Sequence, residues 1–447
     1  MHPLQKKDLE NIWHPCSQMK DYEDLPPIII KRGNGIYLYD INEKSYIDAI
    51  SSWCVNIFGH NNKRINNALK KQVDSLEHVI FSNFSHEPAI ELSEKILEVS
   101  PKGLAKIFFG DNGSSAIEIS MKLSFQYHKQ IGFKNKTKFL SLKNGYHGET
   151  IGALSVSKTP LYSKVYDKIL LDTIEVESPD CFRCPYSKIR DNCNIECFEH
   201  MENTIKTQHE NITAVIIEPM VQCASGMKMY PKEYLERLRE ITKSYNINLI
   251  ADEIAVGFGR TGKFFGVNHA NITPDMMCIS KGLTGGYLPL SLVVTTNEIY
   301  DAFYDDYHKL KSFLHSHSYS GNPLACSVAI ETLNIFKEEQ TIKILKHKSS
   351  YFKHCVEKSF RDKKHVGEIR SLGMICAVEL VKDKKTKSQF NPKDRIGYNI
   401  YKIAIENSLI LRPLGDVLYF MPPYIITNEQ MDEMIEKAIF SYDKFFK

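Results

Sequence analysis

Residues 249–262, LIADEIAVGFGRTG, contain an apolar run that ends in two acidic residues and a glycine-rich turn. Residues 276–286, MMCISKGLTGG, have the same layout, with a lysine at the turn. A short apolar run bounded by glycine is typical of a buried strand. Each segment therefore predicts a strand that is followed by a tight turn.

Strand-like and helix-like segments alternate on either side of these two runs. Short apolar runs that stop at glycine or proline predict strands over 105–113, 138–145 and 213–220. Amphipathic periodicity predicts helices over 114–130 and 234–246. This alternation predicts an α/β fold with a mainly parallel sheet covered on both faces. In open sheets of this kind, ligands bind beyond the carboxyl ends of the strands.

The two ends of the chain have a different pattern. Charged helices and short strands, such as 374–381 and 416–423, alternate after about residue 335 and predict a smaller α+β domain. Residues 28–48 predict a hairpin around Gly33 and Gly35. We therefore expect an N-terminal segment that packs with the small domain, a large domain and a small C-terminal domain, over residues 1–55, 56–335 and 336–447.

Composition narrows the classes of function. The 447 residues are 43% hydrophobic and 25% charged, and 57 basic against 54 acidic residues give a net charge of +3. Such a balance predicts neither a nucleic-acid partner nor binding to an anionic membrane. No apolar window is long enough for a membrane span, and the first residues, MHPLQKKDLENIW, do not resemble a signal peptide. We expect a cytoplasmic enzyme.

Four features indicate the chemistry when they are combined. Asp252 ends an apolar strand, where a carboxylate is costly to bury without a charged partner, and Lys281 stands beside a glycine-rich turn that can hold its amine as a nucleophile. Gly113 and Ser114 begin a helix whose free N–H groups suit a phosphate. Tyr146 follows a strand and can stack on a planar ring. Taken singly, these residues fit a loop cap, a surface lysine, an ordinary turn and a locally packed tyrosine.

Together they are the parts that a pyridoxal phosphate site needs. Their order and the sequence motifs around them also resemble the class III (omega) aminotransferases of fold type I over essentially the whole chain. The motifs that carry this resemblance are GDNGSSA, KNGYHGET, IIEPMVQCASG, ADEIAVGFGRTG, CISKGLTGGYLPL and HSHSYSGNPLA, which begin at residues 110, 143, 216, 251, 278 and 315.

The resemblance implies catalytic roles for residues around the cofactor ring. Lys281 would form the Schiff base with pyridoxal 5'-phosphate and then move protons, and Asp252 would keep the pyridine nitrogen protonated. Ile254 and Tyr146 would pack on opposite faces of the ring, with Glu218 as an acid close to it.

The resemblance also implies a phosphate site shared between two subunits. Gly113 and Ser114 would bind the phosphate, and His317 and Ser318 would reach it from the neighbouring subunit. A homodimer with two active sites is therefore expected.

The ends of the chain resemble one branch of this family, the 7,8-diaminopelargonate synthases of biotin biosynthesis. The segments that do so are 12–19, 51–60 and 412–424. This implies conversion of 8-amino-7-oxononanoate to 7,8-diaminononanoate, with Arg412 on the substrate carboxylate and Trp53 along its aliphatic chain. A guanidinium suits a carboxylate, although Arg412 would also fit a structural ion pair.

The amino donor is less defined by the sequence. Most members of the branch use S-adenosylmethionine, which we take as the expected donor. Cys16, Cys54 and Glu149 depart from the family pattern on the donor side of the pocket. Residues 303–322 resemble a group that uses L-lysine, which remains the alternative.

Nine of the eleven cysteines fall into two groups. Single cysteines in apolar surroundings are expected to be buried free thiols; these are Cys54, Cys223, Cys278, Cys326 and Cys376. A cluster within 181–197 has zinc-like spacing but also fits free thiols or a disulfide; it comprises Cys181, Cys184, Cys193 and Cys197. The expected chemistry needs no metal, so none is assigned.

Other functions remain as alternatives. Racemases and an aminomutase share the lysine and the aspartate, so only Arg412 and Trp53 argue against them. A cofactor-binding regulator would need a DNA-binding module, for which the chain has neither spare residues nor a basic patch. A scaffold would have no use for the lysine, the aspartate and the phosphate loop together.

Overall fold

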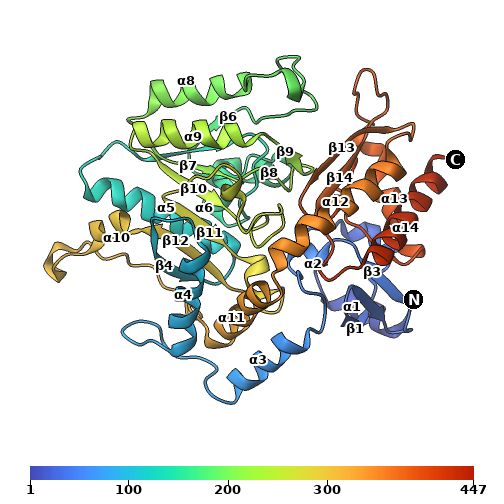
Figure 1. Ribbon diagram of the computed structural model, residues 1–447, viewed down its shortest axis with the longest axis horizontal. Helices are drawn as coiled ribbons and strands as arrows, with labels where there is room; N and C mark the ends of the chain where they lie inside the picture. Colours follow the sequence, from blue (N-terminus) through green and yellow to red (C-terminus); the bar gives the residue numbers. More distant parts are fainter.

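The computed structural model describes residues 1–447, except for the side chain of Asp191. A seven-stranded sheet forms the centre of the larger part (Figure 1). In spatial order, its strands are β4 (Leu104–Gly110), β12 (Ser291–Thr296), β11 (Met276–Ile279), β10 (Asn248–Asp252), β7 (Ile212–Ile217), β5 (Lys138–Leu142) and β6 (Ile174–Val176).

Most strands of this sheet run in the same direction. β11, β10, β7, β5 and β6 are parallel neighbours, whereas β12 is antiparallel to both of its neighbours. Along β10, Ile250 faces a core cluster with α5, while Leu249 and Ala251 face clusters on the opposite side. Since both faces are covered, the predicted α/β fold with a mainly parallel sheet is confirmed.

Helices enclose this sheet and connect it to the ends of the chain (Figure 1). In chain order, the helices up to residue 338 are α1 (Pro3–Asn11), α2 (Ser51–Cys54), α3 (Lys63–Val73), α4 (Glu87–Val99), α5 (Gly113–Gln130), α6 (Ile151–Val156), α7 (Pro160–Ser163), α8 (Glu199–Gln208), α9 (Lys232–Ser244), α10 (Asn297–Phe303) and α11 (Pro323–Glu338). A two-stranded ribbon, β8 (Val221–Gln222) with β9 (Lys228–Met229), lies beside the sheet.

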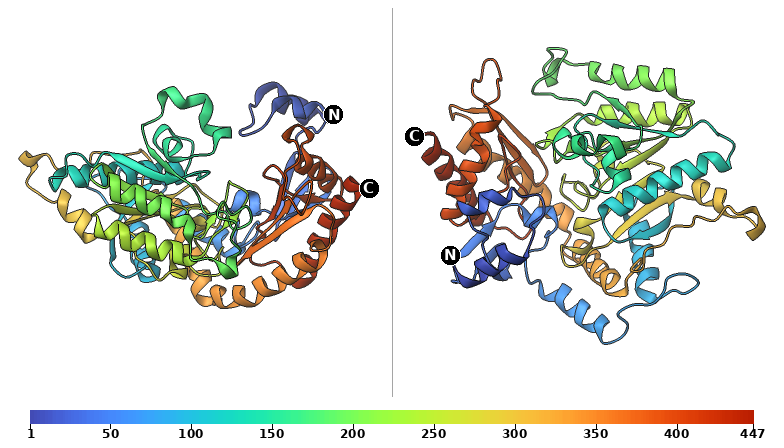
Figure 2. Two further views of the ribbon diagram at one scale, coloured as in Figure 1. Left: turned by 90° about the horizontal axis from the view of Figure 1, so that it is seen from above. Right: turned by 180° about the vertical axis from the view of Figure 1, so that it is seen from behind.

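Two smaller sheets lie side by side at the other end of the molecule (Figure 2). One is formed by β13 (Val366–Leu372), β14 (Ile375–Leu380) and β16 (Val417–Phe420), and the other by β1 (Ile30–Asn34), β2 (Tyr37–Asp40), β3 (Ser45–Asp48) and β15 (Leu409–Ile410). The helices of this part are α12 (Thr341–Phe360), α13 (Ile396–Glu406) and α14 (Asn428–Phe446).

The second of these sheets joins the two ends of the chain. β15 pairs in parallel with β3, so residues near the C-terminus complete a sheet that begins at residue 30. We expected a two-stranded hairpin over 28–48, but this region forms three strands, β1, β2 and β3. A third strand, β3, lies between β2 and β15 in this sheet. Sequence periodicity cannot reveal its pairing with β15, which is distant in the chain.

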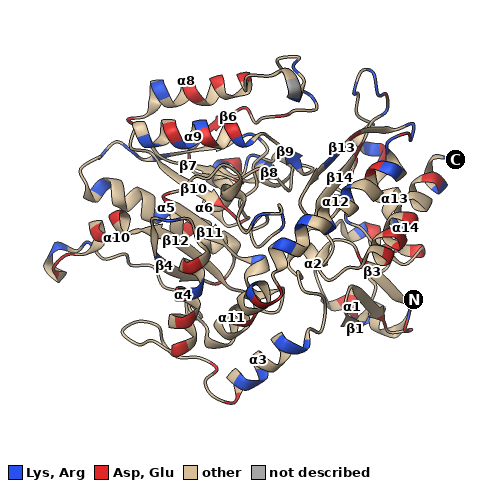
Figure 3. Ribbon diagram, viewed as in Figure 1, with Lys and Arg blue, Asp and Glu red and all other residues tan. Residues whose placement is uncertain are grey.

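Charged residues of both signs are interspersed along the outer helices (Figure 3). α3 and α10 are exceptions, because the charged side chains of α3 are all basic and those of α10 are all acidic. Among the described helices, none combines the length and the apolar character that a membrane crossing requires.

Candidate functional site

Asp252 and Lys281 lie after neighbouring parallel strands. β10 ends at Asp252, which is in register with Cys278 of β11, and Lys281 begins the turn after β11. Burial raises the pKa of the Cys223 thiol, and the charge of Lys281 lowers it while that of Asp252 raises it. Because β10 and β11 are parallel neighbours, the two residues predicted to act together lie at the same carboxyl edge of the sheet.

His147 is the immediate partner of Asp252. Its Nδ1 lies 2.7 Å from Asp252 Oδ2, and both side chains are buried. The backbone N–H of Ile254 donates to the other oxygen, Oδ1, at 3.1 Å. His147 Nε2 is buried and has no partner among the described residues. We did not select His147 from the sequence, although its place beside Tyr146 in KNGYHGET could have indicated it.

Glu218 connects the loop of Tyr146 to a second loop. Its Oε1 accepts the N–H of Tyr146 at 3.2 Å, and its Oε2 accepts the N–H of Cys223 at 2.9 Å. Burial raises the pKa of Glu218 to about 7, against the effect of His147 and with a further contribution from Asp252. Glu218 can therefore hold a proton next to the Asp252–His147 pair near neutral pH.

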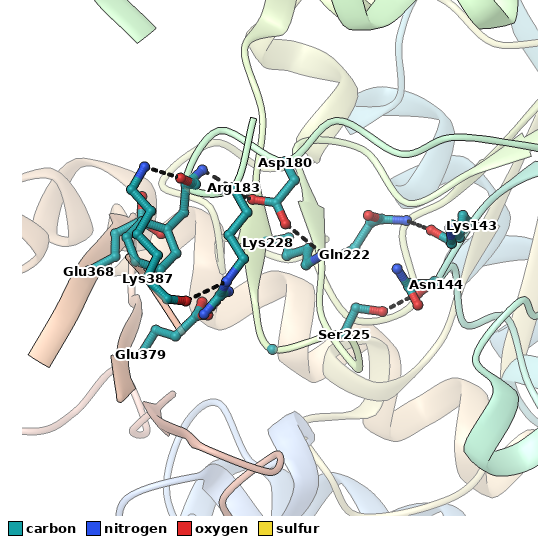
Figure 4. A network of polar contacts seen from close by, with 12 residues as sticks. Lys143, Asn144, Asp180, Arg183, Gln222, Ser225, Lys228, Glu368, Glu379 and Lys387 are labelled. Atoms are coloured by element: carbon teal, nitrogen blue, oxygen red, sulfur yellow. Dashed lines mark hydrogen bonds and ion pairs between the residues drawn. The ribbon is translucent and has the colours of Figure 1, made fainter. Parts of the chain in front are cut away.

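A network of polar contacts fixes the same two loops from outside (Figure 4). Ser225 donates to the carbonyl of Asn144, and Gln222 donates to that of Lys143 at 3.2 Å. On the other side, Lys228 pairs with Asp180 at 2.9 Å. The backbone before Tyr146 is thereby tied to the β8–β9 ribbon.

The start of α5 has the form of an anion cradle. Asn112 caps the helix by accepting the N–H of Ser115 at 3.0 Å, and the N–H groups of Gly113 and Ser114 have no partner within the helix. A Cβ on Gly113 would lie 3.0 Å from Ile254, so these predicted site residues are in close contact. Gly148, with φ +132°, approaches Ser114 so closely that a Cβ would lie 2.1 Å from its hydroxyl.

His317 lies beside this cradle within the same chain. Its Nδ1 is 2.7 Å from Asp111 Oδ2, just before α5. Ser318 is exposed. A contact of either residue with a neighbouring subunit therefore stays a prediction.

Trp53 and Arg412 contact each other on the rim of the site. The guanidinium carbon of Arg412 lies 4.7 Å from the centre of the Trp53 ring, and Arg412 Nη2 donates to the carbonyl of Cys16 at 2.8 Å. Cys16 Sγ is 3.7 Å from the hydroxyl of Tyr162, whose ring packs on Tyr146 at 5.5 Å. The structure thus connects both predicted substrate residues to the Tyr146 side of the site.

Of the three residues that depart from the family pattern, Cys16 and Glu149 lie on this rim, whereas Cys54 is buried. Tyr146 donates its hydroxyl to Glu149 at 2.9 Å. Cys54 follows Trp53 and donates its thiol to Met421 Sδ at 3.3 Å. Cys16 therefore contacts Arg412 and Glu149 contacts Tyr146, while the Cys54 thiol lies in the core next to Trp53 in the chain.

The clustered cysteines line one small cavity away from this site. Its volume is about 20 Å³, and its lining includes Cys181, Cys184, Cys193 and Cys197. Burial raises the pKa of Cys197 to about 12, and the other three thiols add to this effect. In the described part of the chain, no group of three or more His, Cys, Asp or Glu side chains is arranged to hold a metal ion. The singly placed cysteines are buried and free, as expected.

Comparisons with known proteins agree with this geometry. Residues 18–439 match the family model described as aminotransferase class-III. The adenosylmethionine-8-amino-7-oxononanoate aminotransferase of Helicobacter pylori is 42% identical, with 98% of each chain covered. The crystal structure of the Methanocaldococcus jannaschii protein of that name has a TM-score of 0.94 at 36% identity, covering 99% of this chain and 98% of the other. An omega transaminase from Pseudomonas jessenii, solved in complex with PMP, has a TM-score of 0.94 at 32% identity, with 99% and 98% covered.

Proposed function

We propose that this chain, which belongs to the class III aminotransferase family, transfers an amino group to 8-amino-7-oxononanoate and so produces 7,8-diaminononanoate. Enzymes of this family depend on pyridoxal 5'-phosphate, and the chain is accordingly a pyridoxal-phosphate-dependent aminotransferase. The names of its relatives support the acceptor. The contact between Trp53 and Arg412 is the structural observation that carries the proposal.

The described residues fit the cofactor. The N–H groups of Gly113 and Ser114, which have no partner within the helix, suit its phosphate. The Asp252 carboxylate, oriented by His147, suits a protonated ring nitrogen. Ile254, which touches Gly113, and Tyr146 offer apolar and aromatic surfaces for the ring. The contact across the subunit boundary is proposed for His317 and Ser318.

Each residue of the site has a defined task in this proposal. The bound cofactor supplies an electron sink for the electrons released at the substrate carbon. Lys281 would anchor the cofactor and, in each half-reaction, would move a proton at its Nζ between the reacting carbon of the bound substrate and the cofactor. Asp252 keeps the ring nitrogen protonated. Glu218, whose pKa is raised to about 7 by burial, adds a proton-holding group nearby.

Arg412 and Trp53 account for the acceptor. 8-Amino-7-oxononanoate ends in a carboxylate that an aliphatic chain separates from the reacting ketone. A guanidinium binds the carboxylate through charge-assisted hydrogen bonds, and the half-exposed Trp53 ring offers an apolar wall for the chain.

S-Adenosylmethionine is the proposed amino donor, in line with the names of the relatives. L-Lysine is the second candidate, because Cys16 and Glu149 alter the rim that a large donor must pass, and Cys54 alters the residue next to Trp53. The band of the bound cofactor near ~420 nm distinguishes the two donors, since only a true donor removes it in a single turnover.

We also propose that the enzyme is a cytoplasmic homodimer. Large apolar side chains are exposed around the segment that carries His317 and Ser318; they include Tyr304, Tyr307, Leu310, Leu314 and Tyr319. Exposed apolar surface of this extent supports a protein interface there. The proposed division into domains remains 1–55, 56–335 and 336–447.

Replacing Arg412 with alanine tests the acceptor assignment. Loss of a charge-assisted contact of about 1.5–3 kcal/mol should weaken the half-reaction with 8-amino-7-oxononanoate about 10- to 150-fold. The half-reaction with the amino donor should change less. Single-turnover absorbance measures the two halves separately.

Arg395→Ala is the matched control. Arg395 is exposed and forms a bidentate pair with Asp21, at 2.7 and 2.6 Å, so its loss should leave both halves unchanged. If Arg412→Ala slows both halves equally, Arg412 is structural or serves both substrates. If it slows neither, the carboxylate binds elsewhere and the acceptor assignment fails.

A further inference from the structure

Trp53 stands in a left-handed turn made entirely of residues with side chains. Ser51, Ser52, Trp53 and Cys54 have φ values of 50°, 45°, 75° and 68°. Consecutive L-residues avoid this conformation because Cβ then approaches the following carbonyl oxygen. Such a turn persists only where its surroundings hold it. Two buried charged side chains do so in this protein, one at each end.

Asp48 holds the first half of the turn. Its Oδ1 accepts the N–H of Ser52 at 3.0 Å and that of Ile50 at 3.3 Å, and its Oδ2 accepts the Ser52 hydroxyl at 2.7 Å. His60 Nε2 lies 2.9 Å from the same Oδ2. Burial acts to raise the pKa of Asp48, but the hydrogen bonds from His60 and Ser52 lower it below its ordinary value. Asp48 is therefore a buried carboxylate that stays charged.

Arg260 holds the end of the turn from the GFGRTG motif. Its side chain is 1% exposed, and its Nη2 donates to the carbonyl of Cys54 at 3.3 Å. Its Nη1 donates to the carbonyls of Pro422 at 2.8 Å and Met421 at 3.2 Å. The Ser51 hydroxyl donates to the same Met421 carbonyl at 2.6 Å. Arg260 thus ties the turn to the segment that follows β16.

The loop of Lys281 packs directly against the chain after the turn. Gly286 has a φ of +85°, and a Cβ on it would lie 3.0 Å from the Cα and the N of Asn56. Because these are backbone atoms, they cannot move aside as the end of a side chain would. The turn therefore has a fixed position relative to Lys281.

We propose that Asp48 and Arg260 are positioning residues that hold Trp53 against Arg412, and that they thereby set how far the acceptor enters. The proposal rests on the proposed function, since it takes Trp53 and Arg412 as the acceptor wall. A guanidinium over an indole ring is attracted to it, so fixing Trp53 also orients Arg412. Asp48 and Arg260 act through the backbone and not by touching the substrate.

Tryptophan fluorescence tests the positioning role without any substrate. The chain has two tryptophans, so Trp13→Phe leaves Trp53 as the single reporter. In that parent, Arg260→Lys and the milder Ser52→Ala, at an exposed position, are compared by emission spectrum and acrylamide quenching. Both variants should shift the emission and increase quenching, because Arg260→Lys disturbs the bond to the Cys54 carbonyl and Ser52→Ala removes the hydroxyl bond to Asp48.

Arg370→Lys is the matched control for these spectra. Arg370 is also buried and also donates to backbone carbonyls, those of Gly226 at 2.6 Å and Met227 at 3.1 Å, but it does not bond to the turn. Its replacement should leave Trp53 fluorescence as in the parent, even if it lowers the melting temperature.

Single-turnover kinetics test the consequence for the acceptor. A displacement of about 1 Å at a positioned group can cost about 100-fold in rate, so Arg260→Lys should slow the acceptor half-reaction about 10- to 100-fold. The cofactor absorbance band should stay as in the parent. Ser52→Ala should show a smaller effect of the same kind.

Three outcomes separate this proposal from the proposed function. Unchanged fluorescence in both folded variants overturns the positioning role. Changed fluorescence with an unaffected acceptor half-reaction overturns the claim about acceptor depth. Changed fluorescence in a parent enzyme that does not react with 8-amino-7-oxononanoate supports the positioning role and refutes the proposed acceptor.

Discussion

Lys281→Ala should eliminate amino transfer while the protein still folds and binds its cofactor. Loss of the proton-transferring amine alone should cost about 10²- to 10⁴-fold in rate, and the covalent anchor is lost as well. The phosphate cradle at Gly113 and the Asp252–His147 pair remain, so cofactor binding should survive. Turnover assays and the absorbance of the bound cofactor measure the two properties separately.

Lys158 is the most informative control for this prediction. It is half-buried, burial lowers its pKa, and its backbone N–H donates to the carbonyl of Gly145, next to Tyr146. Lys158 is therefore a second lysine close to the site whose amine could react with the cofactor. Borohydride reduction and peptide mapping should label Lys281, and Lys158→Ala should stay active. A label on Lys158 would refute the assignment.

Asp252→Asn is expected to have the second largest effect. A buried charge that loses its partner costs about 3–5 kcal/mol, which corresponds to about 100- to 5,000-fold in rate. The substitution keeps the shape of a side chain that lies 2.7 Å from His147, so the fold should be preserved. Turnover and circular dichroism of the same preparation provide the measurement.

Glu253→Gln is the control for Asp252. Glu253 is the next residue and is also buried, but it accepts the N–H groups of Gly266 at 2.7 Å and Val267 at 2.8 Å. Burial raises its pKa to about 8, so it is largely uncharged at neutral pH. Glu253→Gln should lower the melting temperature yet keep turnover per folded enzyme. Equal loss of turnover in both variants would show that the loss follows from changing any buried carboxylate at this strand end and is not specific to Asp252.

Local sequence patterns were sufficient to predict five of the seven strands of the large sheet, but not β6 and β12. The apolar runs before Asp252 and Lys281 are short and end at glycine turns, and both form buried strands. Parallel pairing then brings their carboxyl ends to one edge, as the fold class requires. The same local reasoning predicted the helix over 114–130, and α5 forms there.

Contacts between distant parts of the chain could not be predicted in this way. Asp48 and Arg260 carry no local signal of their link to Trp53, because that link depends on the Met421 carbonyl and on a left-handed turn. His147 was missed for a different reason. Its motif was recognised, but a histidine beside a stacking tyrosine has no preferred partner until the fold brings Asp252 to it.

The pairing of β3 with β15 has a consequence for biosynthesis. During synthesis on the ribosome, N-terminal parts of a protein generally fold first. Here Ile47 and Asp48 pair with Leu409 and Ile410, so the sheet beside Trp53 cannot be completed until nearly the whole chain has been made. A nascent chain that stops before residue 409 should expose an open strand edge at β3, which is a site for aggregation. This part of the enzyme is therefore protected from aggregation only after the full-length chain has been released from the ribosome.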